Sequence, residues 1–364
     1  MKTTIKILIL TLCFNLNLFA NDFVIGYESF QKKDYVKAEE YYKKACDTGI
    51  FKACYNLGYM YEQGQGVEQN FDKAIEIHSK ACDNANINSC YSIALMYYYG
   101  KGFKQNDIKA YEFFHRGCSL EDGNSCNQLA NMIYYGKGVK QDYKNASEYY
   151  KKACDNNNLD SCLELANMYQ KGEGVNQDYS KSTEIFLKLC DKGFTKACHN
   201  LGFMYHQGYG IKQDYIKARE FFKKACDSNN FASCLNLGIM YELGLGGQKD
   251  SFKSKESYEK ACDGGEVNAC YTLGLLYDSG IGLFYDLKNG IKQDDTKVKT
   301  LYKKACDGKI ELACKKYDLL NDKVIPIGGI QIPPTKSFYQ IQNRAYIHRL
   351  LNPRKTLQWN FVPN

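Results

Sequence analysis

Paired cysteines at a fixed spacing constrain this sequence more than any other feature. Of its 17 cysteines, 16 form eight pairs whose two members lie eight residues apart. The first seven pairs recur every 36 residues, and the last follows after 44 because of an eight-residue insertion near residues 283–290. The pairs are Cys46–Cys54, Cys82–Cys90, Cys118–Cys126, Cys154–Cys162, Cys190–Cys198, Cys226–Cys234, Cys262–Cys270 and Cys306–Cys314. A fixed period of this length predicts one supersecondary unit stacked into a long solenoid, instead of several globular domains.

The first half of each unit is expected to be an amphipathic helix. Its apolar residues in the first unit follow the i, i+3, i+4, i+7 spacing: Ala38, Tyr41, Tyr42 and Ala45. An Asp or Asn precedes the helix in every unit and can cap it: Asp34, Asn70, Asn106, Asp142, Asp178, Asp214, Asp250 and Asp294. Gly or Asn near its end suits a left-handed C-cap: Gly49, Asn157, Gly193, Asn229 and Gly308.

A second helix follows in each unit. Cys54, Leu57, Gly58 and Tyr61 form its expected buried stripe, and the position of Gly58 is Gly or Ala in the next six units. A small residue there lets neighbouring helices approach closely. The second helix ends in a Gly-x-Gly loop, first at Gly64 and Gly66, which we interpret as a turn. None of these loops follows a strand, so they are not nucleotide-binding loops.

The cysteine spacing also predicts how the two helices are joined. Eight residues within one helix would separate two Cα atoms by about 12 Å, beyond the limit of roughly 7 Å for a disulfide. The chain must therefore reverse between the two cysteines of a pair. We expect all eight pairs to be structural disulfides that hold helix hairpins together, and none to supply a nucleophilic thiol or a metal site.

The repeated pattern resembles the Sel1-like repeats, which are relatives of the tetratricopeptide arrays. The residues that carry the match are Leu57-Gly58, Tyr61, Gly64-Gln-Gly66-Val67, Asp72-Lys73-Ala74 and Ala81-Cys82. The 36-residue version with paired cysteines is similar to the Helicobacter cysteine-rich protein family, and the resemblance covers about residues 28–316. It implies an exported, all-α, right-handed α/α solenoid. It also implies penicillin binding with slow β-lactamase activity, and a link to host interaction.

The ends of the chain differ from the repeats. Lys2 and Lys6 before an apolar stretch predict a signal peptide at residues 1–20, cleaved after Ala20. Cys13 would suggest a lipoprotein, but the preceding Leu12 is larger than such sites require. Residues 21–33 are expected to form an N-terminal half-repeat cap, residues 34–316 the eight repeats, and residues 317–364 a basic, proline-containing tail. That tail either caps the last repeat, stays partly disordered, or binds an acidic partner or a membrane surface.

The distribution of charge and of apolar residues along the chain narrows the classes of protein to which it can belong. Of the formal charge of +7, the signal region carries +2 and residues 315–364 carry +6, which leaves the rest at −1. A nucleic-acid-binding protein would instead spread a basic face over its fold. No run long enough to cross a membrane follows the N-terminus. We therefore expect a secreted or periplasmic protein, a monomer, with no nucleic-acid partner and no transmembrane segment in the mature chain.

The residues offer little support for catalysis. A single Ser-x-x-Lys motif, Ser257 and Lys260, matches the nucleophile and base spacing of serine β-lactamases, but Ser257 occupies a core position of the repeat and no Lys-Thr-Gly follows. His199 and His206 lie about 10.5 Å apart along one helix, which is too far to hold one Zn²⁺. No metal or cofactor is therefore expected, and any β-lactamase activity rests on the resemblance.

Binding is the leading expectation, by analogy with tetratricopeptide arrays whose second helices line a concave face. The candidate groove residues are Tyr91, Tyr98, Asn127, Asn131, Tyr134, Asn167, His199 and Phe203. Asparagine at such positions can hold the backbone of an extended peptide, and tyrosine gives contact area at a low entropic cost. The expected ligand is a peptide, a protein, a peptidoglycan fragment or a β-lactam. The alternative for these positions is inter-helix packing or plain solvation, and a third reading of the whole chain is a host-directed secreted effector.

Overall fold

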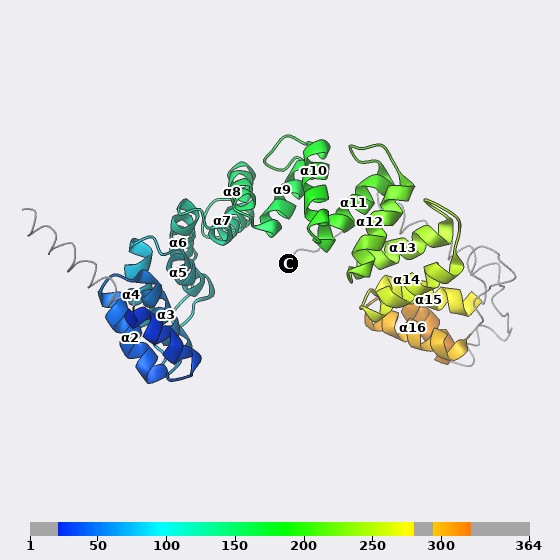
Figure 1. Cartoon of the computed structure of the whole chain (residues 1–364). Helices are drawn as coiled ribbons and strands as arrows, with labels where there is room; N and C mark the ends of the chain where they lie inside the picture. Colours follow the sequence, from blue (N-terminus) through cyan, green and yellow to red (C-terminus); the bar gives the residue numbers. More distant parts are fainter. Residues whose placement is uncertain (1–20, 280–293, 322–364) are drawn as a thin grey trace, which may run out of the picture. The chain divides into compact units, whose positions relative to one another are not determined.

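The structure is a computed structural model that describes residues 21–279 and 294–321 (Figure 1). Within these residues all regular secondary structure is helical, and there is no strand. Residues 21–31 are helical, and the helices that follow are α2 (Tyr35–Asp47), α3 (Phe51–Gln63), α4 (Phe71–Asp83), α5 (Ile87–Tyr99), α6 (Asp107–Ser119), α7 (Gly123–Tyr135), α8 (Tyr143–Asp155), α9 (Leu159–Lys171), α10 (Tyr179–Asp191), α11 (Thr195–Gln207), α12 (Tyr215–Asp227), α13 (Phe231–Leu243), α14 (Ser251–Asp263), α15 (Val267–Ser279), α16 (Asp295–Asp307) and α17 (Glu311–Asn321). Even-numbered helices from α2 to α16 are the first helices of the repeats, and odd-numbered helices from α3 to α17 are the second.

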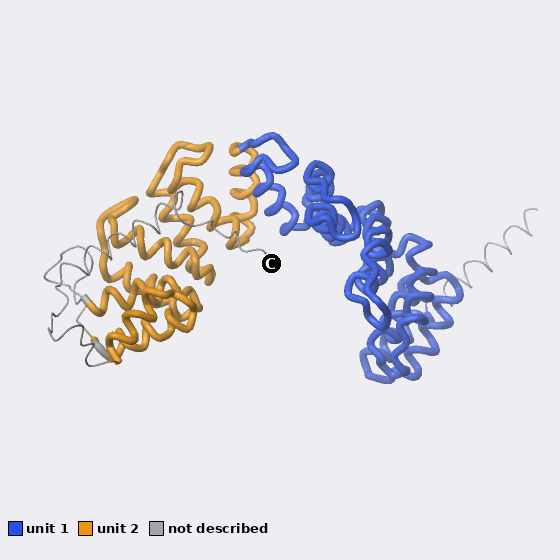
Figure 2. The backbone as a smooth tube through the Cα atoms, turned by 180° about the vertical axis from the view of Figure 1, so that it is seen from behind, with its two compact units in different colours: residues 1–178 blue, residues 179–364 orange. Residues whose placement is uncertain are grey.

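The chain divides into two compact units, coloured separately in Figure 2. Unit 1 ends at Asp178 and unit 2 begins at Tyr179. The predicted signal peptide, the insertion near residues 283–290 and most of the tail lie outside the described residues. Each unit is therefore considered by itself below.

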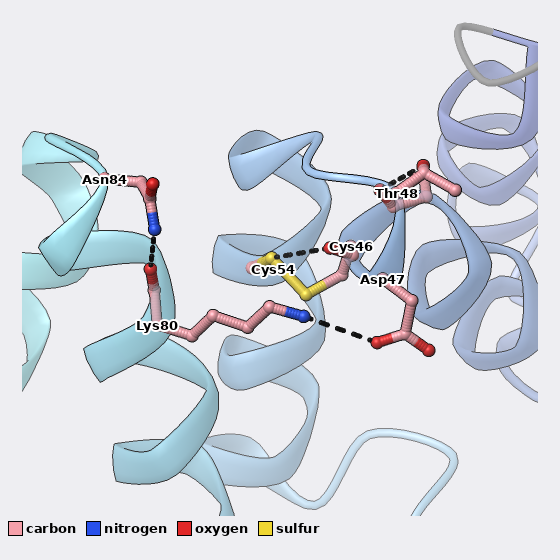
Figure 3. A network of polar contacts seen from close by, with 7 residues as sticks. Cys46, Asp47, Thr48, Cys54, Lys80 and Asn84 are labelled. Carbon is pink, nitrogen blue, oxygen red and sulfur yellow. Dashed lines mark hydrogen bonds and ion pairs between the residues drawn. A yellow bond between two sulfur atoms is a disulfide. The ribbon is translucent and has the colours of Figure 1, made fainter. Parts of the chain in front are cut away.

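All eight predicted disulfides are present, and each closes one helix hairpin. The Cα atoms of the paired cysteines lie 4.5–4.8 Å apart, so the chain does reverse between them. Figure 3 shows the first of these hairpins, where Cys46 near the end of α2 is joined to Cys54 near the start of α3. The spacing rule therefore predicted both the turn and the pairing.

The predicted N-caps explain where the first helices begin. The side chains of Asp34, Asn70, Asn106, Asp142, Asp214, Asp250 and Asp294 each accept a hydrogen bond from the backbone N–H three residues later. Four second helices have such caps too, which the sequence reading missed: Asn86, Asp122, Asn158 and Asn230. Each of these four stands four residues before a cysteine, with Ser directly before that cysteine.

The turn between the two helices shows one difference from expectation. Gly49, Asn157, Gly193 and Asn229 have the left-handed backbone expected of them, but Gly308 has φ −79° and the left-handed residue of that hairpin is Lys309. The turn has the same backbone shape as in the other hairpins, but here the glycine stands one residue before the left-handed position. A left-handed lysine is strained where glycine would not be.

The same core contact, between a first helix and the second helix before it, recurs in both units. The first helices each bury one large ring or histidine at the same position: Tyr42, His78, Phe114, Tyr150, Phe186, Phe222, Tyr258 and Tyr302. Gly58, Gly202 and Gly238 lie directly against the rings of His78, Phe222 and Tyr258, where an added Cβ would come within 2.5–2.7 Å of ring atoms. The small residue in the second helix is therefore needed to make room for the ring of the next first helix.

Ion pairs on the surface also join successive first helices. Lys80 Nζ lies 3.4 Å from Asp47 Oδ1 (Figure 3), and Arg116 lies 2.7 Å from Asp83. Two further pairs, Lys224–Asp191 and Lys304–Asp263, repeat the arrangement in unit 2. All are exposed, so each is worth at most about 1 kcal/mol.

Candidate functional site: the second-helix face

The expected groove residues all lie on second helices, but they divide between the two units. Tyr91, Tyr98, Asn127, Asn131, Tyr134 and Asn167 lie on α5, α7 and α9 of unit 1, whereas His199 and Phe203 lie on α11 of unit 2. All eight are partly exposed. We call the six in unit 1, together with Tyr99, Tyr135 and Glu164 on the same helices, the second-helix face.

His199 is used in packing between repeats of unit 2. Its Nδ1 lies 2.7 Å from the Oγ of Ser233 in the next repeat, and its ring lies 5.7 Å from that of Phe222. Burial lowers the pKa of His199 to about 4, so the ring is neutral near pH 7. Phe203 contacts Tyr209, with 5.7 Å between ring centroids.

Asn127 makes the same kind of link in unit 1. Its Oδ1 accepts a hydrogen bond of 2.7 Å from the Oγ of Ser161, which lies 34 residues further along the chain and is fully buried. The separation between His199 and Ser233 is also 34 residues. At both positions the side chain contacts a serine of the next repeat. The serine before the second cysteine of a pair was the available sequence signal.

The asparagines of the next position are also engaged. Asn131 Oδ1 accepts a hydrogen bond of 2.6 Å from the hydroxyl of Tyr150. Burial raises the pKa of that hydroxyl, which therefore stays protonated and keeps donating. Asn167 Nδ2 lies 3.4 Å from Glu164 Oε2 on the same helix. Asn131 is thus held by the core, while Asn167 is oriented from its own helix.

Two equivalent tyrosine pairs dominate the face. Tyr98 and Tyr99 meet edge-on with 5.1 Å between ring centroids, and Tyr134 and Tyr135 do so at 4.9 Å. The inner ring of each pair packs on the buried ring of the next first helix, at 6.2 and 6.3 Å. The outer rings, Tyr99 and Tyr135, are 63% and 65% exposed. The sequence reading named the inner tyrosines and missed the outer ones, although both directly follow the residues it chose.

Each of these Gly-x-Gly loops contacts the second helix of the preceding repeat. The central loop residue Lys101 forms an ion pair of 2.8 Å with Glu62, one repeat earlier. In the following repeat Lys137 Nζ lies over the ring of Tyr98, 3.6 Å from its centroid. In the one after that, Glu173 Oε2 accepts a hydrogen bond of 2.6 Å from the hydroxyl of Tyr134. The central residue of each loop therefore connects neighbouring repeats through its side chain. Its charge differs from one repeat to the next.

Ser257 and Lys260 are bonded to different parts of the protein. Ser257 is buried, and its Oγ donates a hydrogen bond of 2.7 Å to the backbone oxygen of Lys253 on its own helix. Lys260 Nζ contacts the backbone oxygen of Asp227, in the preceding repeat, at 3.4 Å. A nucleophile and its base need a shared hydrogen bond. The two side chains do not have that arrangement.

A buried carboxyl group in unit 2, that of Glu242, has a raised pKa. Glu242 Oε2 accepts a hydrogen bond of 2.7 Å from the hydroxyl of Tyr258, while Oε1 has no partner. Burial raises the pKa of Glu242 to about 7, against the lowering effects of the Tyr258 hydroxyl and of Lys249. Its counterpart Glu62 is instead paired with Lys101. Among the described residues, no three His, Cys, Asp or Glu side chains gather into a group able to hold a metal ion.

Comparison with known proteins agrees with the repeat architecture. The Sel1 repeat family matches residues 26–49, 51–86, 87–122, 123–158, 159–194, 195–230, 232–266 and 267–309. Two solved structures share the fold: c5321, a protective antigen of uropathogenic Escherichia coli (TM-score 0.73, 24% identity, 91% of this chain and 69% of that one), and a Sel1 repeat protein from Oxalobacter formigenes (TM-score 0.70, 20% identity, 83% and 87%).

Curated relatives match over short segments. A Helicobacter pylori protein named "Putative beta-lactamase HcpC" is 47% identical over 45 residues, which are 12% of this chain and 16% of that protein. Another, "Putative beta-lactamase HcpD", is 42% identical over 48 residues, 13% of this chain and 16% of its own length. The matched segments thus span about a sixth of these relatives. In the described residues, no helix has the length and apolar character needed to cross a bilayer. The Sel1 repeat family matches most of this chain, and the chain therefore belongs to that family.

Proposed function

We propose that this chain is an exported binding scaffold whose second-helix face in unit 1 holds an extended segment of a partner protein. The observation that carries the proposal is the pair of outer tyrosines, Tyr99 and Tyr135. They are exposed, they occupy equivalent positions in successive repeats, and their inner partners are fixed by core packing. Rigid tyrosines provide contact area at a low entropic cost, as interface hot spots do.

Export is supported by the disulfides. Eight disulfides are typical of a protein outside the cytoplasm, because cytoplasmic thiols are kept reduced. Residues 1–20, which we propose as a cleaved signal peptide, lie outside the described residues, as does the tail from residue 322. We also retain residues 21–33 as the proposed N-terminal cap: Gly26 lies against the ring of Tyr42, the same contact that small residues make in the repeats.

Selection of peptides tests the binding proposal. The oxidised mature chain is panned against a random 12-residue peptide library on phage, and selected peptides are synthesised and measured by fluorescence anisotropy. We expect Tyr99→Ala to weaken their binding about tenfold, because a buried aromatic contact at an interface is worth 1 kcal/mol or more.

Two further variants complete the test. Asn131→Ala and Asn167→Ala are checked by melting first, since Asn131 holds the hydroxyl of buried Tyr150. The matched control is Ile108→Ala, an exposed apolar residue on α6, a first helix. Binding that is unchanged in Tyr99→Ala, or lost equally in Ile108→Ala, means that the partner does not bind the second-helix face.

A second candidate, slow hydrolysis of the β-lactam amide, is favoured only by the names of the Helicobacter relatives. Nitrocefin turnover by the purified oxidised chain tests it, with Ser257→Ala as the comparison. Turnover that disappears in that variant supports an enzyme built on Ser257. Turnover that persists places any active residue elsewhere, and absence of turnover removes this candidate.

A further inference from the structure

The second helix of the last repeat, α17, exposes an apolar side chain at a position that is buried in every earlier repeat. Six residues after the second cysteine of each pair the chain carries Met or Leu: Met60, Met96, Met132, Met168, Met204, Met240, Leu276 and Leu320. The first seven are at most 2% exposed, whereas Leu320 is 41% exposed. Within each unit, the first helix of the next repeat packs against the second helix before it. No helix follows α17 among the described residues.

Two further leucines extend the apolar surface of α17. Leu312 is 41% exposed and Leu319 is 47% exposed. With Leu320 they stand at i, i+7 and i+8, which places all three on one side of the helix. The position of Leu312 is polar or Ala in the other seven repeats: Lys52, Asn88, Asn124, Asp160, Lys196, Ala232 and Asn268. We call Leu312, Leu319 and Leu320 the α17 apolar face.

This face differs from the surface that receives a first helix in the earlier repeats. At Gly58, Gly202 and Gly238 the ring of the next first helix lies where a Cβ would be. The equivalent residue of α17 is Asp318, and its side chain takes up the space that such a ring needs. A further helix of the repeat type therefore does not fit here in the usual way, whereas an extended segment brings no ring to this position.

The sequence directly after α17 has the composition of such a segment. Five of the residues 324–332, which lie outside the described residues, are Val or Ile, and none is charged: Val324, Ile325, Ile327, Ile330 and Ile332. Pro326, Gly328 and Gly329 disfavour a helix there. In an extended chain, side chains two residues apart point to the same side, which pairs Ile325 with Ile327.

Residues 324–332 are near enough to the α17 apolar face, and long enough, to cover it. Only Asp322 and Lys323 separate them from Asn321, where α17 ends. Leu312 and Leu320 are eight residues apart in one helix, which is about 12 Å along its axis. Nine extended residues span about 30 Å. A chain that turns back after α17 can therefore pass over all three leucines.

We propose that residues 324–332 lie in extended form across the α17 apolar face and cover the last repeat. The terminal repeat of a solenoid has an apolar side that must be covered, and this segment is apolar, adjacent and of sufficient length. The inference goes beyond the proposed function, because it concerns α17 of unit 2 and a segment of the same chain. The basic residues that follow position 335 are not needed for the contact.

Photo-cross-linking in the full oxidised mature chain tests the contact. Leu312→p-benzoylphenylalanine carries the cross-linker on the α17 apolar face, at the leucine furthest in sequence from the proposed segment. The matched control is Phe252→p-benzoylphenylalanine, which places the same group at an exposed aromatic position on α14. We expect peptide mass mapping to find cross-links within one chain from position 312 to residues 324–332, and none to these residues from position 252.

Paired substitutions in the tail identify the segment that makes the contact. Ile325→Asp/Ile327→Asp is expected to abolish the cross-link from position 312 and, with Leu312 unchanged, to lower the hydrogen-exchange protection of the α17 amides about tenfold. Ile341→Asp/Ile347→Asp makes the same change further along the tail and is expected to leave both measurements unchanged. Circular dichroism confirms that each variant is folded.

Other occupants of the face give different results. Cross-links from position 312 that join two chains identify a second copy, and cross-links to residues 338–351 identify a later part of the tail. Either result overturns the proposal. It is also overturned if position 312 gives no cross-link, or if the cross-link persists in Ile325→Asp/Ile327→Asp. Peptide binding by the second-helix face of unit 1 is measured separately, so failure here leaves the proposed function standing.

Discussion

One position in the first helix sets the character of each repeat. It holds Tyr or Phe in seven of the eight repeats and His78 in the other, and all eight side chains are buried. His78 Nδ1 lies 3.2 Å from Ser89 Oγ, while Nε2 has no partner and faces Gly58. A histidine here fills the volume of a ring but adds a titratable group to the core.

Replacing His78 by Phe is expected to remove an acid sensitivity of unit 1. Burial lowers the pKa of His78 from 6.5 to about 4. The unfolded chain therefore binds a proton below pH 6.5 that the folded chain does not bind until about pH 4. Stability is complete above pH 6.5 and falls as pH drops towards 4, by about 3 kcal/mol at one site.

Hydrogen exchange of the α4 and α5 amides between pH 7.5 and pH 4.5 measures this loss. We expect it in the native chain and not in His78→Phe. The exposed His115→Phe serves as control and should behave as the native chain. An equal loss in His78→Phe and the native chain would assign the acid sensitivity to other groups.

Replacing Glu242 by Gln is expected to remove a loss of stability that unit 2 suffers as the pH rises. Burial raises the pKa of Glu242 from 4.5 to about 7. The folded chain then holds a proton that the unfolded chain releases above pH 4.5. Stability is complete below pH 4.5 and is lost as pH rises through 7, by about 3 kcal/mol at this site.

Exchange of the α13 and α14 amides from pH 5 to pH 8 tests this. Protection should decline with pH in the native chain after correction for intrinsic exchange, and should stay level in Glu242→Gln, where the amide can still accept from Tyr258. Glu62→Gln is the matched control, since it changes the same repeat position where Lys101 supplies the partner. A decline that persists in Glu242→Gln contradicts the assignment.

At the scale of helices, the hairpin is the unit that the disulfide stabilises. The linked cysteines are close to the turn, and the ring of the next first helix covers the second helix from the other side. Two helices of this length cannot bury a core by themselves, so each hairpin depends on its disulfide and on its neighbours.

Removing one disulfide is expected to loosen one hairpin. Closing a loop of this size is worth about 2.6 kcal/mol by the chain-entropy estimate. Cys118→Ser/Cys126→Ser should lower protection by roughly that amount in α6 and α7 and less in helices further away. Protection that falls equally along unit 1 would mean that the unit opens as one cooperative body.

The helix starts and the hairpins were predictable from local sequence, whereas the contacts made by the second-helix face were not. Asp142 before an amphipathic run fixes a helix start by itself, and a cysteine pair eight residues apart fixes a reversal. The partner of Asn127 is a serine 34 residues away, and that contact depends on how repeats stack. Glu173 reaches Tyr134 for the same reason. The serine before the second cysteine is visible in the sequence, but spacing within one repeat does not say which residue of the preceding repeat contacts it.

At the scale of the molecule, stability is expected to depend on oxidation. Reduction with tris(2-carboxyethyl)phosphine under native conditions should lower the melting temperature markedly and broaden the transition, because weakened repeats melt less cooperatively. Circular dichroism melting with and without reductant measures this. Peptide mapping of the oxidised chain should return only links between cysteines eight residues apart. A reduced chain that melts like the oxidised one would make the disulfides dispensable.

The local reach of every disulfide has a consequence for how such a chain is made and how it changes. In an oxidising environment, each hairpin can form its disulfide as soon as its own two helices are available, without waiting for distant sequence. The low sequence separation of the bonded residues also limits mispairing during synthesis. Insertion or loss of a whole repeat adds or removes two cysteines together, so the array can lengthen or shorten without creating an unpaired thiol.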